Sequence, residues 1–264
     1  MKSFRLWTVV ALLLIAAAVV LFYPPARLSA LALAGRSPNC PFSQAVKSHA
    51  NLQDQIDTKD RILAASKLIE TDEQGFEHWQ TPRGRYWIPG ESRYSLHFNL
   101  AEMERRIYGT GPQAVQPGDI VLDCGANVGT FTRQALNDGA ELVVAIEPAP
   151  ENLECLRRAF APEIASGRVL VYPKGVWHKD DFLPMYIHPE NSPADSFLMH
   201  NEHSELSAKK IPLTTIDKLV AELQLPRVDY IKMDIEGAEP NALEGARQTL
   251  SKYHPRVSVA VYHA

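Results

Sequence analysis

The chain has 264 residues, of which 45% are hydrophobic and 22% charged, a composition typical of globular proteins. This length is enough for one sizeable domain with additional segments. The net charge of −4 gives no support to a nucleic-acid binder, so we expect no nucleic-acid partner. The cysteines Cys40, Cys124 and Cys155 lack the paired spacing of a metal site and are odd in number, which favours free thiols in a reducing compartment.

The chain begins with an apolar segment that carries basic residues and no acidic ones up to residue 53. The stretch Leu6–Tyr23 is free of charge over 18 residues, and as a helix it would be about 27 Å long, close to the hydrocarbon thickness of a bilayer. Trp7 and Tyr23 lie at its ends, as interfacial aromatic residues do, and Pro24 and Pro25 would end the helix. The segment therefore predicts a single-pass transmembrane anchor over residues 1–23.

Two other interpretations of this segment stay open. A cleaved signal peptide would use the small residues Ala32–Ala34 as its cleavage site, although that site lies well past the apolar run. A buried core helix is the other interpretation. The charges do not decide the orientation of an anchor, because Lys2 and Arg5 before the run balance Arg27 and Arg36 after it.

The next stretch is predicted to contain a linker and a small extension. Residues 24–53 form a polar, basic juxtamembrane linker with some helix, and residues 54–110 form a helical and hairpin extension. Within the extension, apolar stripes predict helices over Asp54–Glu70 and Tyr94–Tyr108. Between them, aromatic runs on both sides of the turn sequence "TPRG" predict a hairpin over Phe76–Ile88.

From Gly118 onward, strand and helix patterns alternate. We expect strands at 119–123, 141–147, 168–176, 228–234 and 256–262, and helices at 128–138, 150–160, 215–223 and 239–252. This alternation predicts an α/β fold with a parallel sheet covered on both faces by right-handed crossovers. Residues 177–214 form a less regular insert in which short antiparallel strands are expected.

The first strand of this region, in "DIVLDCGANVGTF", runs directly into a turn that contains two glycines. The dinucleotide pattern G-x-G-x-x-G fails here, because Asn127 and Thr130 stand where glycine is needed. The pattern D-x-G-x-G-x-G, typical of S-adenosylmethionine binders, is met by Asp123, Gly125 and Gly129, and only Asn127 departs from it. Asparagine tolerates a left-handed backbone, so the departure is mild. Asp123 could bind the ammonium group of the cofactor or order the turn.

An acid follows the next predicted strand. In "VVAIEP", Glu147 stands 22 residues after Gly125, and its carboxylate can accept bonds from both hydroxyls of a ribose. The glycine turn and Glu147 together predict a nucleoside site. An NAD-type pocket would use the same acid, and a plain tight turn with a solvated glutamate is the non-functional interpretation.

A second polar cluster follows the strand in "VDYIKMDIEGAEP". Lys232, Asp234 and Glu236 are the catalytic candidates, and Glu239 stands close to them in the sequence. Lys232 lies within a buried strand and needs a partner, for which Asp234 or Glu236 is expected. A carboxylate here could bind or deprotonate a hydroxyl. A purely structural ion-pair network stays possible, and no metal site is predicted, because no histidine joins the acids.

The motifs "VLDCGANVGTF", "VVAIEP", "GVW", "PLTTID" and "YIKMDIEGAE" resemble, in this order, the FkbM methyltransferases. The resemblance covers about residues 95–263 and implies a seven-stranded, Rossmann-like class I methyltransferase domain over 111–264. It implies S-adenosyl-L-methionine as cofactor and usually O-methylation. It also implies cofactor binding by Asp123, Gly125, Asn127, Gly129 and Glu147, and an active-site strand end at Asp234 and Glu236.

The chain departs from the family pattern at two places. A polar residue such as aspartate usually follows "GVW", and His178 stands there instead. The sequence ends at "VSVAVYHA", where family members usually continue with a helix and an antiparallel strand pair. We therefore expect a sheet without its last strands. Strand 256–262 would then be an edge that belongs to a fragment or is covered by a partner or by the N-terminal helices.

The main hypothesis is a membrane-anchored O-methyltransferase that acts on a small molecule, a glycan or a lipid-linked sugar. Glu236 or Asp234 would orient or deprotonate the acceptor hydroxyl, His263 is a weaker candidate, and the insert at 177–214 would line the acceptor pocket. An NAD-linked oxidoreductase and a non-catalytic membrane scaffold are the rival hypotheses. Because S-adenosylmethionine is made in the cytoplasm and the cysteines are unpaired, the domain is expected to face the cytoplasm.

Overall fold

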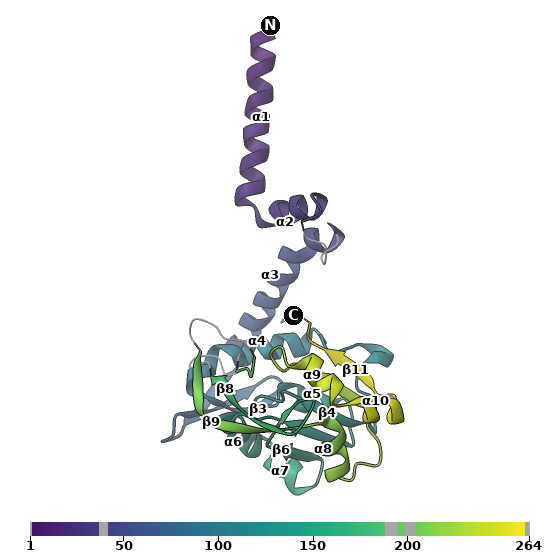
Figure 1. The fold of residues 1–264 in the computed structure, drawn as a ribbon. Helices are drawn as coiled ribbons and strands as arrows, with labels where there is room; N and C mark the ends of the chain where they lie inside the picture. Colours follow the sequence, from purple (N-terminus) through teal and green to yellow (C-terminus); the bar gives the residue numbers. More distant parts are fainter. Residues whose placement is uncertain (1, 37–41, 188–194, 199–203, 262–264) are drawn as a thin grey trace. The chain divides into compact units, whose positions relative to one another are not determined.

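A computed structural model describes residues 2–36, 42–187, 195–198 and 204–261 of the chain. The chain divides into two compact units, Met1–Thr58 and Lys59–Ala264. Figure 1 shows the elements of both units. The boundaries predicted for the linker and the extension stay predictions.

The N-terminal unit is helical almost throughout its described part. Helix α1 (Lys2–Phe22) ends before Pro24, as predicted, and α2 (Pro24–Leu33) follows it at once. Helix α3 (Phe42–Ala64) begins in this unit, so the predicted linker at 24–53 is mostly helix. Among the described residues no single helix meets the length and apolarity of a membrane span; Trp7–Phe22 and Pro24–Leu33 meet them only as a pair bent by 100°. The transmembrane helix therefore stays a prediction.

The larger unit is built around a parallel five-stranded sheet, which confirms the predicted α/β fold. Its strand order is β11-β10-β4-β5-β6, so the order reverses between β4 and β10. The strands are β4 (Ile120–Cys124), β5 (Leu142–Ile146), β6 (Val169–Tyr172), β10 (Tyr230–Met233) and β11 (Arg256–Val259). Among the described residues β11 pairs with β10 alone, and the predicted end of this strand at residue 262 lies outside the described residues.

Alternation along the strands gives the sheet two apolar faces. Leu122 and Ile231 share one buried cluster with side chains of α8 (Ile216–Glu222) and α9 (Glu239–Glu244). The residues that precede them in the sequence point the other way: Val121 and Tyr230 share a cluster with α5 (Thr130–Asn137) and α6 (Pro150–Ala159). The sheet is therefore covered on both faces, as the strand–helix alternation predicted.

Two helical predictions need correction. The helix predicted over 239–252 is divided into α9 and α10 (Arg247–Tyr253), with Gly245 between them. A Cβ atom at Gly245 would lie 2.1 Å from the carbonyl oxygen of Trp177, so the chain approaches that loop too closely for any other residue. A short helix, α7 (Ala161–Ala165), was not predicted.

The extension before the parallel sheet forms an antiparallel sheet and a helix. Strands β2 (Phe76–Thr81) and β3 (Gly84–Pro89) confirm the predicted hairpin, and α4 (Arg93–Glu104) confirms the second helix. The first helix was predicted to begin and end too late, because α3 runs from Phe42 to Ala64 and is followed by β1 (Lys67–Thr71), which pairs with β2. Short 3₁₀ turns lie at Gly90–Ser92 and Gly111–Gln113.

The insert forms a further sheet with the order β7-β9-β8. The strand predicted over 168–176 is divided between β6 in the parallel sheet and β7 (Gly175–Val176) here. Strands β8 (Asp181–Ile187) and β9 (Glu205–Thr214) are antiparallel, as expected for the insert. Between them, Ser196 exchanges backbone hydrogen bonds with Tyr186, which fixes the described segment 195–198 against β8.

Candidate active site

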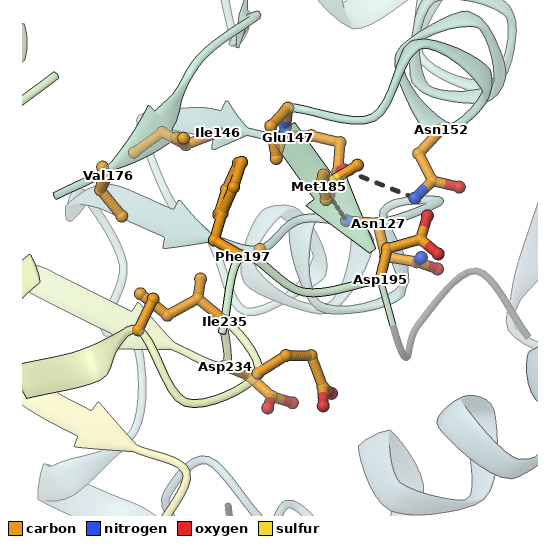
Figure 2. A pocket seen from close by; sticks show the side chains of 15 residues that line it. Asn127, Ile146, Glu147, Asn152, Val176, Met185, Asp195, Phe197, Asp234 and Ile235 are labelled. Atoms are coloured by element: carbon orange, nitrogen blue, oxygen red, sulfur yellow. Dashed lines mark hydrogen bonds between the residues drawn. The ribbon is translucent and has the colours of Figure 1, made fainter. Parts of the chain in front are cut away.

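A pocket opens where β4, β5 and β10 end, beside the reversal of strand order that commonly holds ligands in open α/β sheets. It contains about 540 Å³ of empty space, its open mouth included. Figure 2 shows Glu147 and Asp234 on opposite sides of this hollow. Of the residues predicted from the sequence, Gly125, Asn127, Glu147, Asp234 and Glu236 line it.

The turn after β4 is built from left-handed backbone. Gly125, Asn127 and Gly129 have φ values of 78°, 50° and 87°. A Cβ atom at Gly125 would lie 2.0 Å from the carbonyl oxygen of Asp234, so only glycine lets this turn lie against the loop after β10. At Gly129 it would lie 2.3 Å from a ring carbon of Phe160. Gly125 thus forms the floor of the pocket, whereas Gly129 serves the packing of α5.

The carboxylate of Glu147 faces the glycine turn. Its Oε2 accepts a bond of 2.8 Å from the backbone N–H of Asn127, and its Oε1 accepts one of 2.9 Å from the N–H of Ala149. Asn152 Nδ2 lies 3.4 Å from Oε1 (Figure 2). Burial raises the pKa of Glu147, and the two backbone N–H groups oppose that shift. Because each carboxylate oxygen has a second lone pair, Glu147 can still accept bonds from a ligand.

Asp123 and Lys232 form a buried pair behind the turn. The parallel register places them opposite each other, and Lys232 Nζ lies 3.2 Å from Asp123 Oδ1 and donates to the carbonyl oxygen of Gly125 at 2.7 Å. Asp123 also accepts a bond of 2.7 Å from Thr132 Oγ1. The partner predicted for Lys232 was Asp234 or Glu236; that expectation was wrong, because it ignored the neighbouring strand.

Lys232 is held as a cation, and neither member of the pair lines the pocket. Burial alone would lower the pKa of Lys232, but the charges of Asp123 and Asp234 outweigh it and raise that pKa. Of the alternatives for Asp123, the contacts favour ordering the turn over binding an ammonium group. Lys232 stabilises the same turn through the carbonyl oxygen of Gly125.

The loop after β10 places two carboxylates at the other end of the pocket. Asp234 Oδ2 accepts a bond of 2.6 Å from the hydroxyl of Tyr108, which comes from the extension. Glu236 has a φ of 54°, a left-handed conformation that is costly for a side chain of this kind and is found preferentially at functional sites. Burial, with the charges of Asp234 and Glu239, raises the pKa of Glu236 to about 8. A carboxyl group with this pKa can take up or release a proton near neutral pH.

The insert forms the remaining wall. Met185, Asp195 and Phe197 line the pocket, so the insert contributes to it as expected. Ser196 is buried, and its Oγ donates a bond of 2.7 Å to the carbonyl oxygen of Glu236. That bond ties the insert to the strained residue of the opposite wall.

Several residues at this site were not identified from the sequence. Tyr108 contacts Asp234 across 126 positions of sequence, and no local motif marks it. Asn152 lines the pocket with a buried Oδ1 that has no hydrogen-bond partner among the described residues; its place in the first turn of α6, soon after Glu147, was a usable signal.

Two histidines considered in the sequence do not take part in the described site. His178 Nδ1 lies 2.9 Å from Asn241 Oδ1 and does not line the pocket. His263 lies outside the described residues.

The chemistry of the two ends of the pocket differs. Bare backbone and Glu147 at one end suit a nucleoside, and Asp234 with Glu236 at the other end suit a hydroxyl group. In the described part of the chain, no group of three or more His, Cys, Asp or Glu side chains is arranged to hold a metal ion.

A family model and several solved structures match parts of this chain. Residues 123–264, more than half of the chain, match the family model of the methyltransferase FkbM domain. A solved structure of a methyltransferase FkbM from Methylobacillus flagellatus is 18% identical and aligns with 81% of this chain and 49% of its own, at a TM-score of 0.42. This chain therefore spans about half the length of that protein. No curated protein matches the sequence.

Two further solved structures align with parts of this chain at lower TM-scores. Trm5b from Pyrococcus abyssi is 21% identical over 40% of this chain and 30% of its own, with a TM-score of 0.30. Trm5 from Methanocaldococcus jannaschii, solved with adenosine, is 14% identical over 72% of this chain and 41% of its own, with a TM-score of 0.34.

Proposed function

The chain belongs to the FkbM methyltransferase family, and from that premise we propose that it transfers the methyl group of S-adenosyl-L-methionine to a hydroxyl oxygen. The acceptor belongs to a small molecule, a glycan or a lipid-linked sugar. The observation that carries the proposal is the bond from the N–H of Asn127 to Glu147 Oε2. It brings a carboxylate to the mouth of a glycine turn, with the acids of β10 across the hollow.

The residues present fit the cofactor. Gly125 lines the pocket with backbone alone, and a Cβ atom there could not be accommodated beside the carbonyl oxygen of Asp234. Glu147 would accept the ribose hydroxyls, and the free Oδ1 of Asn152 is a further acceptor at the same end. When bound, S-adenosylmethionine supplies an electrophilic methyl group on a sulfonium. The protein has to hold an acceptor oxygen in line with that methyl group and exclude water.

Glu236 is the proposed base. In its ionised form it would accept the proton of the acceptor hydroxyl as that oxygen forms its new bond to carbon. Asp234, fixed by the hydroxyl of Tyr108, would orient the same hydroxyl. Asp123 and Lys232 would act indirectly, by holding the turn that carries Gly125.

Calorimetric titration of the full-length protein with S-adenosylmethionine, S-adenosylhomocysteine and NAD tests the assignment. We expect the first two to bind and NAD not to bind. Binding of NAD alone would favour the rival oxidoreductase. Binding of S-adenosylhomocysteine without transfer of labelled methyl to any membrane, glycan or small-molecule extract would favour the non-catalytic scaffold.

We also propose that the N-terminal segment attaches the protein to a membrane, with the catalytic domain on the cytoplasmic side. Helix α1 has 21 residues, which corresponds to about 32 Å, and its sequence is uncharged from Leu6 to Phe22. Carbonate-resistant sedimentation with membranes is the expected result. Loss of the domain on protease treatment of sealed, right-side-out vesicles would contradict the proposed orientation.

A further inference from the structure

We propose that a second pocket of the larger unit binds a small ligand through a phosphate group. This pocket lies between the extension and α5, and we call it the arginine pocket after three residues of its wall, Arg83, Arg106 and Arg133. It shares no lining residue with the active-site pocket, whose nucleoside end is formed at Glu147 and whose acceptor end is formed at Asp234 and Glu236. The inference therefore goes beyond the proposed function and does not depend on it.

Three separate elements bring the guanidinium groups of the arginine pocket together. Arg83 lies in the turn of the β2–β3 hairpin, Arg106 follows α4, and Arg133 lies in α5. The hairpin turn packs directly on α5, because a Cβ atom at Gly84 would lie 2.6 Å from Cδ of Arg133. The cluster is thus a product of tertiary packing, and no single segment of the sequence contains it.

The wall of the arginine pocket is cationic. Among the described residues that line it, the three arginines are accompanied by one acid, Asp138, and all the others are uncharged. Glu104 and Glu163, which also contact arginines of this cluster, do not line the pocket. Three positive charges and one negative charge leave the wall with an excess of two positive charges, which favours an anionic ligand.

The acids beside Arg83 and Arg106 leave hydrogen-bond donors for a ligand, because a guanidinium group carries five N–H donors. Arg106 donates two bonds of 2.9 Å to Asp138, and Arg83 Nη2 lies 3.2 Å from Glu104 Oε2. Glu104 is also paired with Arg61, so two arginines share one carboxylate there. The side chains of Arg83 and Arg106 are 38% and 45% exposed, which leaves their remaining N–H groups accessible to a bound anion.

Two buried polar atoms belong to side chains of the same wall. Arg133 Nε has no hydrogen-bond partner among the described residues, although Nη2 of this arginine donates to the carbonyl oxygens of Arg85 and Ala159. Gln134 Oε1 is likewise buried without a partner in the described part of the chain. An unpaired buried donor or acceptor is costly, so a ligand that supplies both acceptor oxygens and a hydroxyl donor would stabilise this pocket.

This combination of groups favours a phosphate ester over a carboxylate. Guanidinium groups pair with phosphate through two parallel bonds, and a phosphate ester with one substituent has three acceptor oxygens and close to two negative charges at neutral pH. Three guanidinium groups from different elements can surround such a group. The hydroxyl groups of a phosphorylated sugar or polyol would supply the donor that Gln134 Oε1 lacks.

Calorimetric titration of the full-length protein with glycerol 3-phosphate, at constant ionic strength, tests the site without any methyl transfer. We expect saturable binding that persists in the presence of S-adenosylhomocysteine, because the two pockets share no lining residue. Malonate carries a similar charge on two carboxylates and should bind at least about tenfold more weakly.

Three results of this titration would overturn the inference: no saturable binding of glycerol 3-phosphate, its displacement by S-adenosylhomocysteine, or equal or tighter binding of malonate. Failure of S-adenosylhomocysteine itself to bind would reject the proposed function and would leave saturable binding of glycerol 3-phosphate as support for the arginine pocket.

Variants assign the binding to the arginine pocket. Arg83→Gln should weaken the affinity for glycerol 3-phosphate by about tenfold or more, as expected for the loss of a charged donor, and Arg106→Gln should act in the same direction. Arg61→Gln is the matched control, because it removes the other partner of Glu104 and an equal charge but does not alter the pocket lining. Its affinity should change by less than about threefold.

Equal losses of affinity in Arg83→Gln and Arg61→Gln would show an effect of net charge alone and would overturn the assignment. A lower melting temperature in Arg83→Gln, together with unchanged affinity for glycerol 3-phosphate, would also overturn it. The arginines would then serve only to pack the hairpin against α5.

Discussion

The two ends of the pocket are built in different ways. The nucleoside end consists of one strand–turn–helix unit and one acid from the next strand, joined by the bond from the Asn127 N–H to Glu147. The acceptor end is assembled from the extension, the β10 loop and the insert, through the contacts of Tyr108 with Asp234 and of Ser196 with Glu236. The first end is formed by backbone geometry and is the proposed site of the cofactor. The second is a set of charged side chains whose positions depend on distant segments.

The two ends meet at Gly125, so a substitution there should damage both. Gly125→Ala combines a left-handed φ of 78° with a Cβ atom 2.0 Å from the carbonyl oxygen of Asp234. We expect a loss of about 3 kcal/mol or more in the free energy of unfolding, measured with urea, and no detectable cofactor binding. Gly167→Ala is the control, because its φ is 75° and nothing lies within 4 Å of the added atom. Equal losses in the two variants would contradict the close contact.

Glu236→Gln separates the ends by chemistry. It removes the proposed base and leaves the nucleoside end intact, so methyl transfer should fall by about 100-fold or more. The affinity for S-adenosylhomocysteine should change by less than about threefold, since the expected contacts of the nucleoside do not include this residue. An unchanged rate of transfer in Glu236→Gln would reject Glu236 as the base. A parallel loss of affinity for S-adenosylhomocysteine would show that the two ends are not distinct.

The pH dependence of stability tests the raised pKa of Glu236 without a substrate. Its pKa is about 8 in the folded chain against an ordinary value of 4.5, so the folded state binds the proton more tightly than the unfolded state. The stabilisation that Glu236 gives the folded state by binding this proton is therefore fully present below about pH 4.5 and is lost as the pH rises toward 8. The wild type should lose stability relative to Glu236→Gln across this window in thermal unfolding. A constant difference between the two would contradict the raised pKa.

At the nucleoside end, Glu147→Gln should weaken S-adenosylhomocysteine binding by about 10- to 100-fold, as expected for the loss of a charged hydrogen-bond acceptor. The amide oxygen can still accept one of the bonds from the backbone N–H groups of Asn127 and Ala149. Glu151→Gln, an exposed acid in the first turn of α6, is the matched control for calorimetry. Unchanged affinity in Glu147→Gln would reject its role with the ribose.

The smallest effect is expected from Ser196→Ala, which removes the bond to the backbone carbonyl of Glu236 and the bond of 3.0 Å that the N–H of Leu198 donates to Ser196 Oγ. Only the bond to Glu236 reaches a residue of the pocket wall, and loss of one neutral hydrogen bond costs about 1 kcal/mol, so the rate of transfer should fall by about fivefold with little change in cofactor affinity. Ser196→Thr retains the hydroxyl and is the comparison variant. A decrease in cofactor affinity without a decrease in rate would place Ser196 with the nucleoside end instead.

The sequence by itself determined the nucleoside end. The glycines at 125 and 129, the asparagine at 127 and the acid at 147 are local signals, because each follows directly from where a strand stops. The strand–helix alternation likewise determined the parallel sheet, and "TPRG" the hairpin. Such features depend on neighbours in sequence, through backbone conformation and periodicity.

Only the tertiary structure decided which side chains face each other across strands and segments. The register of β10 against β4 places Lys232 beside Asp123, although proximity in the sequence favoured Asp234 or Glu236 as its partner. The folding of the extension brought Tyr108 to Asp234, and the packing of the insert brought Ser196 to Glu236. These contacts arise from long-range pairing and burial, which no spacing within one segment encodes.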